Sequence, residues 1–178
     1  MKPFGMDEGR VRFEQLFLPH LDAAYNLARW LIRNEHDAED LVQEAYLRAF
    51  RFFGGFRGED SRSWLLAIVR NTCYTWLQQN RRQDLETVFD EEVHTRDTDS
   101  FNPEKPLLET ADSQLLQQAL AELPVKFREI LVLRELEGLS YKEISAVAGM
   151  PIGTVMSGLA RARKQLRRSL TEREKKDN

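Results

Sequence analysis

Residues 139–155 read Leu139-Ser-Tyr-Lys-Glu-Ile-Ser-Ala-Val-Ala-Gly-Met-Pro-Ile-Gly-Thr-Val155, and they carry the sharpest local signal in the sequence. Ser140 stands three residues before Glu143, which is the spacing of a capping box, where each side chain binds a free backbone amide at a helix start. Gly149 follows at the distance of a C-cap, where glycine readily adopts the left-handed backbone. The pattern predicts a short helix over Tyr141–Ala148.

A second helix is predicted over Val155–Thr171, after a tight turn at Met150-Pro-Ile-Gly153 and with Thr154 as its cap. Two helices around a Gly-containing turn, the second being the longer, form the helix-turn-helix plan, whose second helix enters the DNA major groove. The outward positions of this second helix are Met156, Ser157, Arg161, Lys164 and Arg168, with Arg163 and Arg167 alongside. A helical hairpin with an ordinary solvated face is the alternative interpretation.

The charge of the chain is segregated along the sequence. Lys and Arg number 26 and Asp and Glu number 29, so the formal net charge is −3. Residues 161–176 are nevertheless mostly basic, opposed only by Glu172 and Glu174. A basic segment in an acidic chain is the electrostatic footprint of nucleic-acid binding, and it favours DNA as the ligand of the second helix.

The composition of the 178 residues excludes several classes of protein. With 42 % hydrophobic and 31 % charged residues, the chain has enough apolar material for a folded core. The single cysteine, Cys73, rules out an internal disulfide framework and a CxxC zinc site, and three scattered histidines argue against a metal centre. The first ten residues hold no apolar signal-peptide stretch, and the longest apolar run, Trp64 to Val69, is far shorter than the roughly 20 residues of a membrane span. These limits predict a cytoplasmic protein.

The sequence divides into three zones, residues 11–82, 83–110 and 111–174. In the outer two, apolar residues recur at intervals of three and four, which predicts helices, and strand signals are nearly absent. The middle zone is acidic and aperiodic and contains Pro103 and Pro106, as expected of a solvated linker. The sequence therefore predicts an all-α chain of two small helical domains joined by a flexible acidic linker. The remaining predicted helices are Val11–Phe17, Leu21–Arg33, Asp37–Phe53, Arg62–Arg82, Asp112–Glu122 and Val125–Glu137.

Two helices of the first domain carry informative polar faces. On Asp37–Phe53, Asp40 and Glu44 are like charges four residues apart, which slightly destabilises a helix. An ordinary solvated face explains them if that helix is considered alone. On Arg62–Arg82, one face combines Arg, Asn, Tyr and Gln without acids, a composition that can stack bases and bind a phosphate backbone. The loop before it carries aromatic and basic groups able to clasp an extruded base, although a turn with buried aromatics explains the same residues.

Several stretches of the chain together resemble a known family. They are Asp37-Ala-Glu-Asp-Leu-Val-Gln-Glu44, Phe56-Arg-Gly-Glu59, Trp64-Leu-Leu-Ala-Ile-Val-Arg-Asn71, Leu123-Pro124, Leu133-Arg-Glu-Leu-Glu-Gly-Leu-Ser-Tyr-Lys-Glu-Ile144, and Gly153-Thr-Val155 with Arg161-Ala-Arg163. In this order and spacing, the chain resembles a bacterial sigma-70 family factor of the extracytoplasmic-function (ECF) group. The stretches cover almost the whole chain outside the linker.

The resemblance implies that residues 11–82 are sigma region 2, which binds core RNA polymerase and the −10 promoter element. The helix Asp37–Phe53 would dock on the clamp helices of the largest subunit, where a basic partner neutralises its acids. The core-binding residues so implied are Asp37, Asp40, Leu41, Glu44, Arg48 and Arg51. The residues implied to read the −10 element as it melts are Arg57, Arg62, Arg70, Asn71, Tyr74, Gln78 and Arg81.

The resemblance also implies that residues 111–174 are sigma region 4, whose helix-turn-helix reads the −35 element while its earlier helices grip the polymerase flap. The −35 residues so implied are Ser140, Tyr141, Lys142, Thr154, Val155, Ser157, Arg161 and Lys164. An anti-sigma factor is a further implied partner, and no cofactor, metal or small-molecule substrate is expected. Where the family commonly has Arg, this chain has Gly158, and that departure predicts a lost DNA contact and a weaker recognition helix.

Three alternatives compete with this hypothesis. A helix-turn-helix regulator that acts without polymerase leaves the region 2 stretches unexplained. A helical protein-interaction adaptor, such as an anti-sigma mimic, leaves the basic final helix unexplained. A hydrolase or nuclease using paired carboxylates such as Glu91-Glu92 lacks an ordered scaffold around those acids, and no nucleophile–base pair or phosphate loop is evident. The sequence therefore predicts a non-enzyme.

Overall fold

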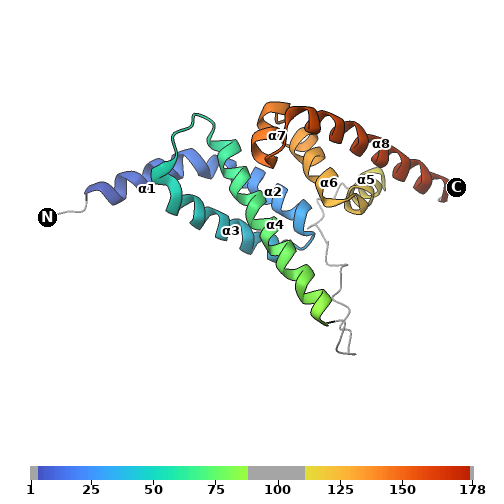
Figure 1. Ribbon diagram of the computed structural model, residues 1–178, viewed down its shortest axis with the longest axis horizontal. Helices are drawn as coiled ribbons and strands as arrows, with labels where there is room; N and C mark the ends of the chain where they lie inside the picture. The colour runs from blue at the N-terminus through green and yellow to red at the C-terminus, as the bar shows by residue number, and fades with distance from the viewer. Residues whose placement is uncertain (1–3, 88–110, 177–178) are drawn as a thin grey trace.

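The computed structural model describes residues 4–87 and 111–176, and in that part of the chain every regular element is a helix (Figure 1). The predicted all-α class is confirmed. Most of the predicted linker, residues 88–110, lies outside the described residues. The helices of the first domain are α1 (Phe4–Phe17), the short η1 (Leu18–His20), α2 (Leu21–Ile32), α3 (Glu35–Phe52), η2 (Phe53–Gly55) and α4 (Ser61–Thr87). Those of the second are α5 (Ala111–Glu122), α6 (Val125–Leu131), η3 (Val132–Leu136), α7 (Tyr141–Ala148) and α8 (Ile152–Lys176).

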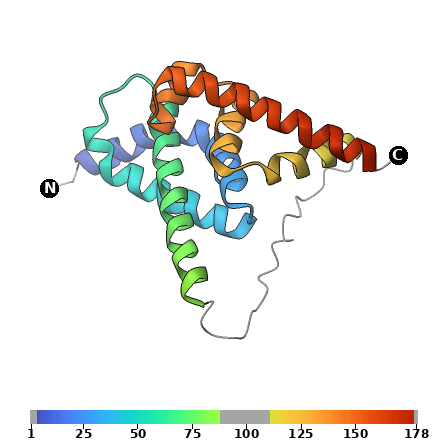
Figure 2. The same cartoon turned by 45° about the vertical axis from the view of Figure 1, so that its right-hand side comes forward.

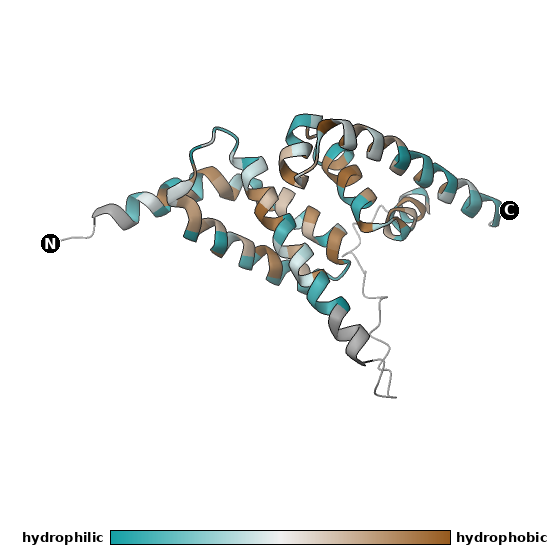
Figure 3. Ribbon diagram, in the orientation of Figure 1, coloured by the Kyte–Doolittle hydropathy of each residue, from teal (hydrophilic) through white to brown (hydrophobic). Residues whose placement is uncertain are grey.

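The first domain is a bundle in which α2, α3 and α4 pack against one another. Its apolar residues at helical spacing supply the core, including the fully buried Leu27, Ala45 and Leu65. The ring of Phe17 packs against Trp64, with ring centroids 5.2 Å apart, and ties the end of α1 to α4. Hydropathy colouring shows brown, apolar stretches alternating with teal, hydrophilic ones along the helices of this bundle (Figure 3).

The second domain is built around the hairpin of α7 and α8. The capping box forms as predicted, since the Glu143 amide donates to Ser140 Oγ at 3.1 Å and the Ser140 amide donates to Glu143 Oε2 at 2.7 Å. Gly149 ends α7 with a φ of 64°. The axes of α7 and α8 differ by 100°, within the range of helix-turn-helix units.

Some helix boundaries differ from those predicted. α8 begins at Ile152 rather than Val155, because the Pro151 carbonyl accepts from the Thr154 and Val155 amides at 3.0 and 3.1 Å. Thr154 therefore lies inside the helix and does not cap it. α3 begins two residues early because Asn34 caps it, accepting from the Asp37 amide at 3.0 Å. The single helix predicted over Val125–Glu137 is divided between α6 and the π-helical turn η3.

The two domains pack against each other. α7 lies against α4, and α6 lies against α2, as two views agree (Figures 1 and 2). α8 runs along the outside of α5 and α6 toward the carboxyl end (Figure 2). No single helix among the described residues is long and apolar enough to cross a membrane; only the bent α7–α8 pair, taken together, has that length and composition.

Candidate functional site

The outer face of α3 carries the acids singled out in the sequence. Asp40 and Glu44 are both exposed, and each has a nitrogen-bearing side chain four residues away on the same helix. Glu44 pairs with Arg48 at 2.5 Å, and Asp40 lies 3.8 Å from His36. The ion pair with Arg48 relieves part of the repulsion between the two acids within the helix.

Two further residues change the description of this face. Leu41 is buried in the bundle, because it belongs to the apolar stripe of α3, and its predicted direct contact with a partner is corrected. Leu47, which sequence reasoning missed, is 69 % exposed, the most exposed large apolar side chain of the described residues. Its position three residues after Glu44, on the polar face of the helix, was the signal that could have found it. Asp37 is partly buried, and Arg51 is exposed.

The residues predicted to contact the −10 element are divided between exposed residues and residues that contact the second domain. Asn71, Gln78 and Arg81 are exposed on α4, and Arg57 is exposed in the loop before it. The other three predicted residues, Arg62, Arg70 and Tyr74, all contact the second domain. Residues 111–176 thus cover part of the predicted −10 surface in this structure.

Glu129 of α6 holds two of these residues. Its carboxylate pairs with Arg70 and accepts from the Tyr74 hydroxyl at 2.7 Å, while the Arg70 guanidinium lies over the Tyr74 ring, 4.3 Å from its centroid. Glu129 is 0 % exposed. Burial raises the pKa of its carboxyl, although Tyr74, Arg70 and Lys126 act in the opposite sense. Burial, and then the charge of Glu129, also raise the pKa of Tyr74.

A second contact between the domains centres on Glu137. Its carboxylate accepts from the Asn26 amide at 2.6 Å, and its backbone carbonyl accepts from Arg62. Arg128, next to Glu129, is buried, and its Nε and Nη1 atoms have no hydrogen-bond partner among the described residues. Burial, with the nearby charge of Arg33, lowers the pKa of Arg128 to about 10. This interface therefore buries charge that is only partly compensated, which costs free energy.

The helix-turn-helix exposes most of the predicted −35 residues. The exposed ones are Ser140, Lys142, Thr154, Ser157, Arg161 and Lys164. Tyr141 is half-buried beneath the Arg134 guanidinium, 4.8 Å from its ring centroid. Val155 is fully buried, because it faces the hairpin core, so its predicted contact with DNA is corrected.

Gly158 also faces the protein rather than the solvent. It is buried where α8 crosses α6, and a Cβ built on it would stand 2.9 Å from Ile130 Cδ1. The structure therefore gives no support to the expectation that Gly158 marks a lost DNA contact, because position 158 faces α6. The glycine instead allows the two helices to approach closely.

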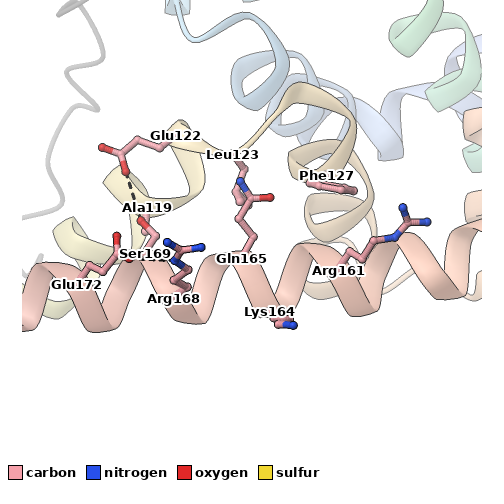
Figure 4. A pocket seen from close by; sticks show the side chains of 10 residues that line it. All are labelled: Ala119, Glu122, Leu123, Phe127, Arg161, Lys164, Gln165, Arg168, Ser169 and Glu172. Carbon is pink, nitrogen blue, oxygen red and sulfur yellow. Dashed lines mark hydrogen bonds and ion pairs between the residues drawn. The ribbon is translucent and has the colours of Figure 1, made fainter.

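A groove of about 530 Å³ opens between α8 and the α5–α6 pair (Figure 4). Its floor is apolar, with Ala119, Leu123 and Phe127, and its rim is charged, with Arg161, Lys164 and Arg168 along α8. The groove is on the side of α8 that meets α5 and α6. The sequence did not indicate it, because it forms only when helices from separate segments pack together.

The described residues offer neither a cluster of metal ligands nor a reactive thiol. They contain no group of three or more His, Cys, Asp or Glu placed to hold a metal ion. Cys73 is buried, and burial, followed by the charges of Glu129 and Glu44, raises its pKa to about 12. A thiol in this state is a poor nucleophile.

Comparison with known proteins agrees with this arrangement. Sigma-70 region 2 matches residues 16–83, and Sigma-70 region 4 matches residues 113–166. The chain is 36 % identical over 149 residues to the ECF RNA polymerase sigma-E factor of Haemophilus influenzae, covering 79 % of this chain and 77 % of that protein. The chain belongs to the ECF group of the sigma-70 family. It is also 37 % identical over 155 residues to ECF RNA polymerase sigma factor SigE of Mycolicibacterium smegmatis, covering 87 % of this chain but 60 % of SigE.

Two solved structures share the fold of this ECF factor. The sigma factor RpoE of Bartonella quintana, solved with the anti-sigma factor NepR, is 31 % identical with a TM-score of 0.74, over 90 % of this chain and 97 % of RpoE. CnrH, solved with the cytosolic domain of CnrY, is 25 % identical with a TM-score of 0.64, over 92 % of this chain and 90 % of CnrH. The match to RpoE spans both domains, which supports their mutual packing.

Proposed function

We propose that this chain binds core RNA polymerase and directs promoter-specific initiation by recognising the −10 and −35 elements. It acts in the cytoplasm as a non-catalytic subunit without a cofactor. The observation that carries the proposal is the presence of both sigma-70 regions in one chain, region 2 before region 4. The basic, exposed second helix of the 100° hairpin supports DNA as one ligand.

Core polymerase docks on the outer face of α3 in this proposal. Asp40 and Glu44 supply negative charge beside the exposed apolar Leu47, which suits a basic helical partner with an apolar centre. The largest-subunit clamp helices are the partner that the family implies. The polymerase flap occupies the groove between α8 and the α5–α6 pair, whose apolar floor fits one face of an amphipathic element.

Promoter DNA binds two separate faces in this proposal. One of them is covered in the arrangement seen here, in which the two domains pack against each other; we call this arrangement closed. The helix-turn-helix is open to a −35 duplex, whereas Arg70 and Tyr74 on the −10 face are occupied by Glu129. The two domains must therefore separate before a melted −10 strand can stack on Tyr74. Polymerase holds them apart in the holoenzyme.

An anti-sigma factor is the second protein partner in this proposal. RpoE of Bartonella quintana was solved in complex with the anti-sigma factor NepR. The compact arrangement of this chain resembles that of RpoE, as the TM-score of 0.74 measures. A partner that stabilises the closed form keeps the −10 face inaccessible.

Assembly with core polymerase tests the proposal. The full-length chain is mixed with purified bacterial core enzyme, and the mixture is separated by size-exclusion chromatography. We expect the chain to co-elute with the core enzyme in equimolar amount. A chain that elutes alone, yet binds promoter duplex tightly and specifically, is a stand-alone regulator. A chain that binds neither core nor DNA is an interaction adaptor, and both of these results contradict the proposal.

A further inference from the structure

The first turns of α8 expose two large apolar side chains. Ile152 is 44 % exposed and Met156 is 53 % exposed. They stand four residues apart, so they lie one above the other on the same face of the helix. Val155 and Leu159 point into the hairpin core instead. Neither exposed residue lines the groove beside α5, so the apolar pair is a separate feature of the surface.

The position of this pair within the hairpin suggests what it contacts. The amino-terminal residues of a recognition helix are the ones that reach base edges in the major groove. Arg161 and Lys164 follow on α8, also exposed, where they can neutralise phosphates. The Arg161 Nε donates to the Ser157 carbonyl at 3.4 Å, so this guanidinium is turned back toward the first turns of the helix. Basic residues thus follow the apolar pair on the same helix, which favours a nucleic acid over an apolar protein surface.

The chemical groups that base pairs expose in the major groove then restrict which of them this apolar pair can contact. The side chain of Met156 offers no hydrogen-bond donor and only a weak acceptor sulfur, and Ile152 offers neither. The apolar group that base pairs present in the major groove is the C5-methyl group of thymine. Methionine is also unbranched and adapts its shape to the surface that it meets.

We propose that Met156, supported by Ile152, reads the methyl group of a thymine in the −35 duplex and is a specificity-determining residue for promoter choice. This inference rests on the proposed function and deepens it, because it names the base feature that α8 recognises. The exposed Thr154 and Ser157 in the same turns are available for hydrogen bonds to neighbouring base edges.

Deoxyuridine substitution tests this inference without altering the protein. A −35 duplex is first selected from random sequence with the holoenzyme, and each thymine in it is then replaced singly by deoxyuridine, which lacks only the methyl group. We expect one position at which the replacement weakens holoenzyme binding about three- to fivefold, the scale of one buried methyl group. Run-off transcription is measured on the same templates.

Protein variants then assign the methyl contact to Met156. In Met156→Ala, we expect thymine and deoxyuridine duplexes to bind equally at that position, whereas Met156→Leu keeps the preference. Leu136→Ala, which removes an equally exposed apolar side chain outside α8, serves as the matched control and also keeps it.

Three results overturn the inference. They are a selected duplex without a −35 thymine, no deoxyuridine effect at any position, and an effect of the same size in Met156→Ala. If run-off transcription persists in these cases, the proposed function stands, and only the proposed contact between Met156 and a thymine methyl group is wrong. If no template yields chain-dependent transcript, the proposed function fails and this inference fails with it.

Discussion

At the scale of single residues, Gly158 decides how closely α8 and α6 approach. The 2.9 Å distance between a built Cβ and Ile130 Cδ1 means that any side chain at 158 requires Ile130 to move. An alanine needs only a small shift and gains about 1 kcal/mol of helix propensity, so the two effects nearly cancel. A long cationic side chain has no such compensation.

Gly158→Arg is therefore expected to lower the free energy of unfolding by about 1–3 kcal/mol, the cost of overpacking, and to leave −35 affinity unimproved. Thermal and urea unfolding of the full chain measure the first effect. Fluorescence anisotropy on a −35 duplex at several salt concentrations measures the second. Gly153→Ala is the control, because a Cβ at 153 meets nothing within 4 Å.

The opposite outcome has a clear meaning. A Gly158→Arg variant with unchanged stability and a steeper salt dependence of DNA binding shows that position 158 faces DNA, because each added phosphate contact increases the salt slope.

Ser140 poses a second residue-scale question, because its hydroxyl caps α7 and was also predicted to contact DNA. Ser140→Ala is expected to lower the free energy of unfolding by about 1 kcal/mol through loss of the cap. Ser140→Asp keeps a good cap and adds negative charge, so it preserves stability and weakens −35 binding if this residue lies beside a phosphate. Unchanged binding by Ser140→Asp, with stability retained, limits Ser140 to capping.

At the scale of elements, α3 combines a buried stripe with an acidic outer face. Asp40→Lys with Glu44→Lys is expected to weaken holoenzyme assembly by roughly 2–5 kcal/mol, since like charges then meet across the interface. The control is Asp7→Lys with Glu8→Lys on α1, which makes the same change in charge at two other exposed residues. Affinity for core enzyme is measured by competition, and circular dichroism checks that the helices are retained.

Equal assembly by the α3 variant and the α1 control removes α3 from the core-binding surface. A loss of helical signal in the α3 variant alone assigns the two acids a structural role through their pairing with Arg48 and His36.

Local patterns were enough to predict most elements. The capping box at Ser140 and the glycine at 149 gave α7 its observed bounds, because both signals act within one helical turn. The start of α8 was missed, because the Pro151 carbonyl satisfies the first amides of the helix and Thr154 is not needed as a cap. The burial of Gly158 was not predicted, because it results from contact with Ile130, which belongs to a different helix.

At the scale of the whole molecule, the packing of the two domains against each other could not be predicted from local sequence patterns. Arg70 and Glu129 are 59 residues apart in sequence, and nothing in the periodicity of α4 or α6 pairs them. The family resemblance assigned Arg70 and Tyr74 to DNA, but it did not indicate that region 4 covers them. The partly compensated burial of Arg128 and Glu129 makes this contact one that a partner can displace.

Glu129→Lys is expected to open the molecule, because it places a second cation against Arg70. Dyes on Gln15→Cys and Lys175→Cys, both exposed, report the distance between the domains by energy transfer, while the buried Cys73 stays unlabelled. The variant should show lower transfer and tighter binding of a single-stranded −10 oligonucleotide than Glu129→Gln, which can keep the hydrogen bonds. Equal energy transfer in Glu129→Lys and Glu129→Gln contradicts a role for Glu129 in holding the two domains together.

The same contact predicts a pH dependence of closure. Burial raises the pKa of the Glu129 carboxyl in the closed arrangement, where Arg70, Tyr74 and Lys126 face it. Separation of the domains is expected to expose this carboxyl to water and so to remove the shift. The closed form therefore binds the proton more readily than the open form, so lowering the pH toward that raised pKa favours closure and raising the pH above it favours opening. Energy transfer measured against pH should lose this dependence in Glu129→Gln, and a curve that the variant leaves unchanged assigns the titration to another group.

The most direct test of the central claim, that this chain is the promoter-specificity subunit of RNA polymerase, is reconstituted run-off transcription from a genomic promoter library with core enzyme. The account predicts discrete transcripts that appear only when the chain is added and that start downstream of a shared pair of −10 and −35 elements. It is contradicted if core enzyme yields no chain-dependent transcript while the free chain binds promoter duplex tightly and specifically.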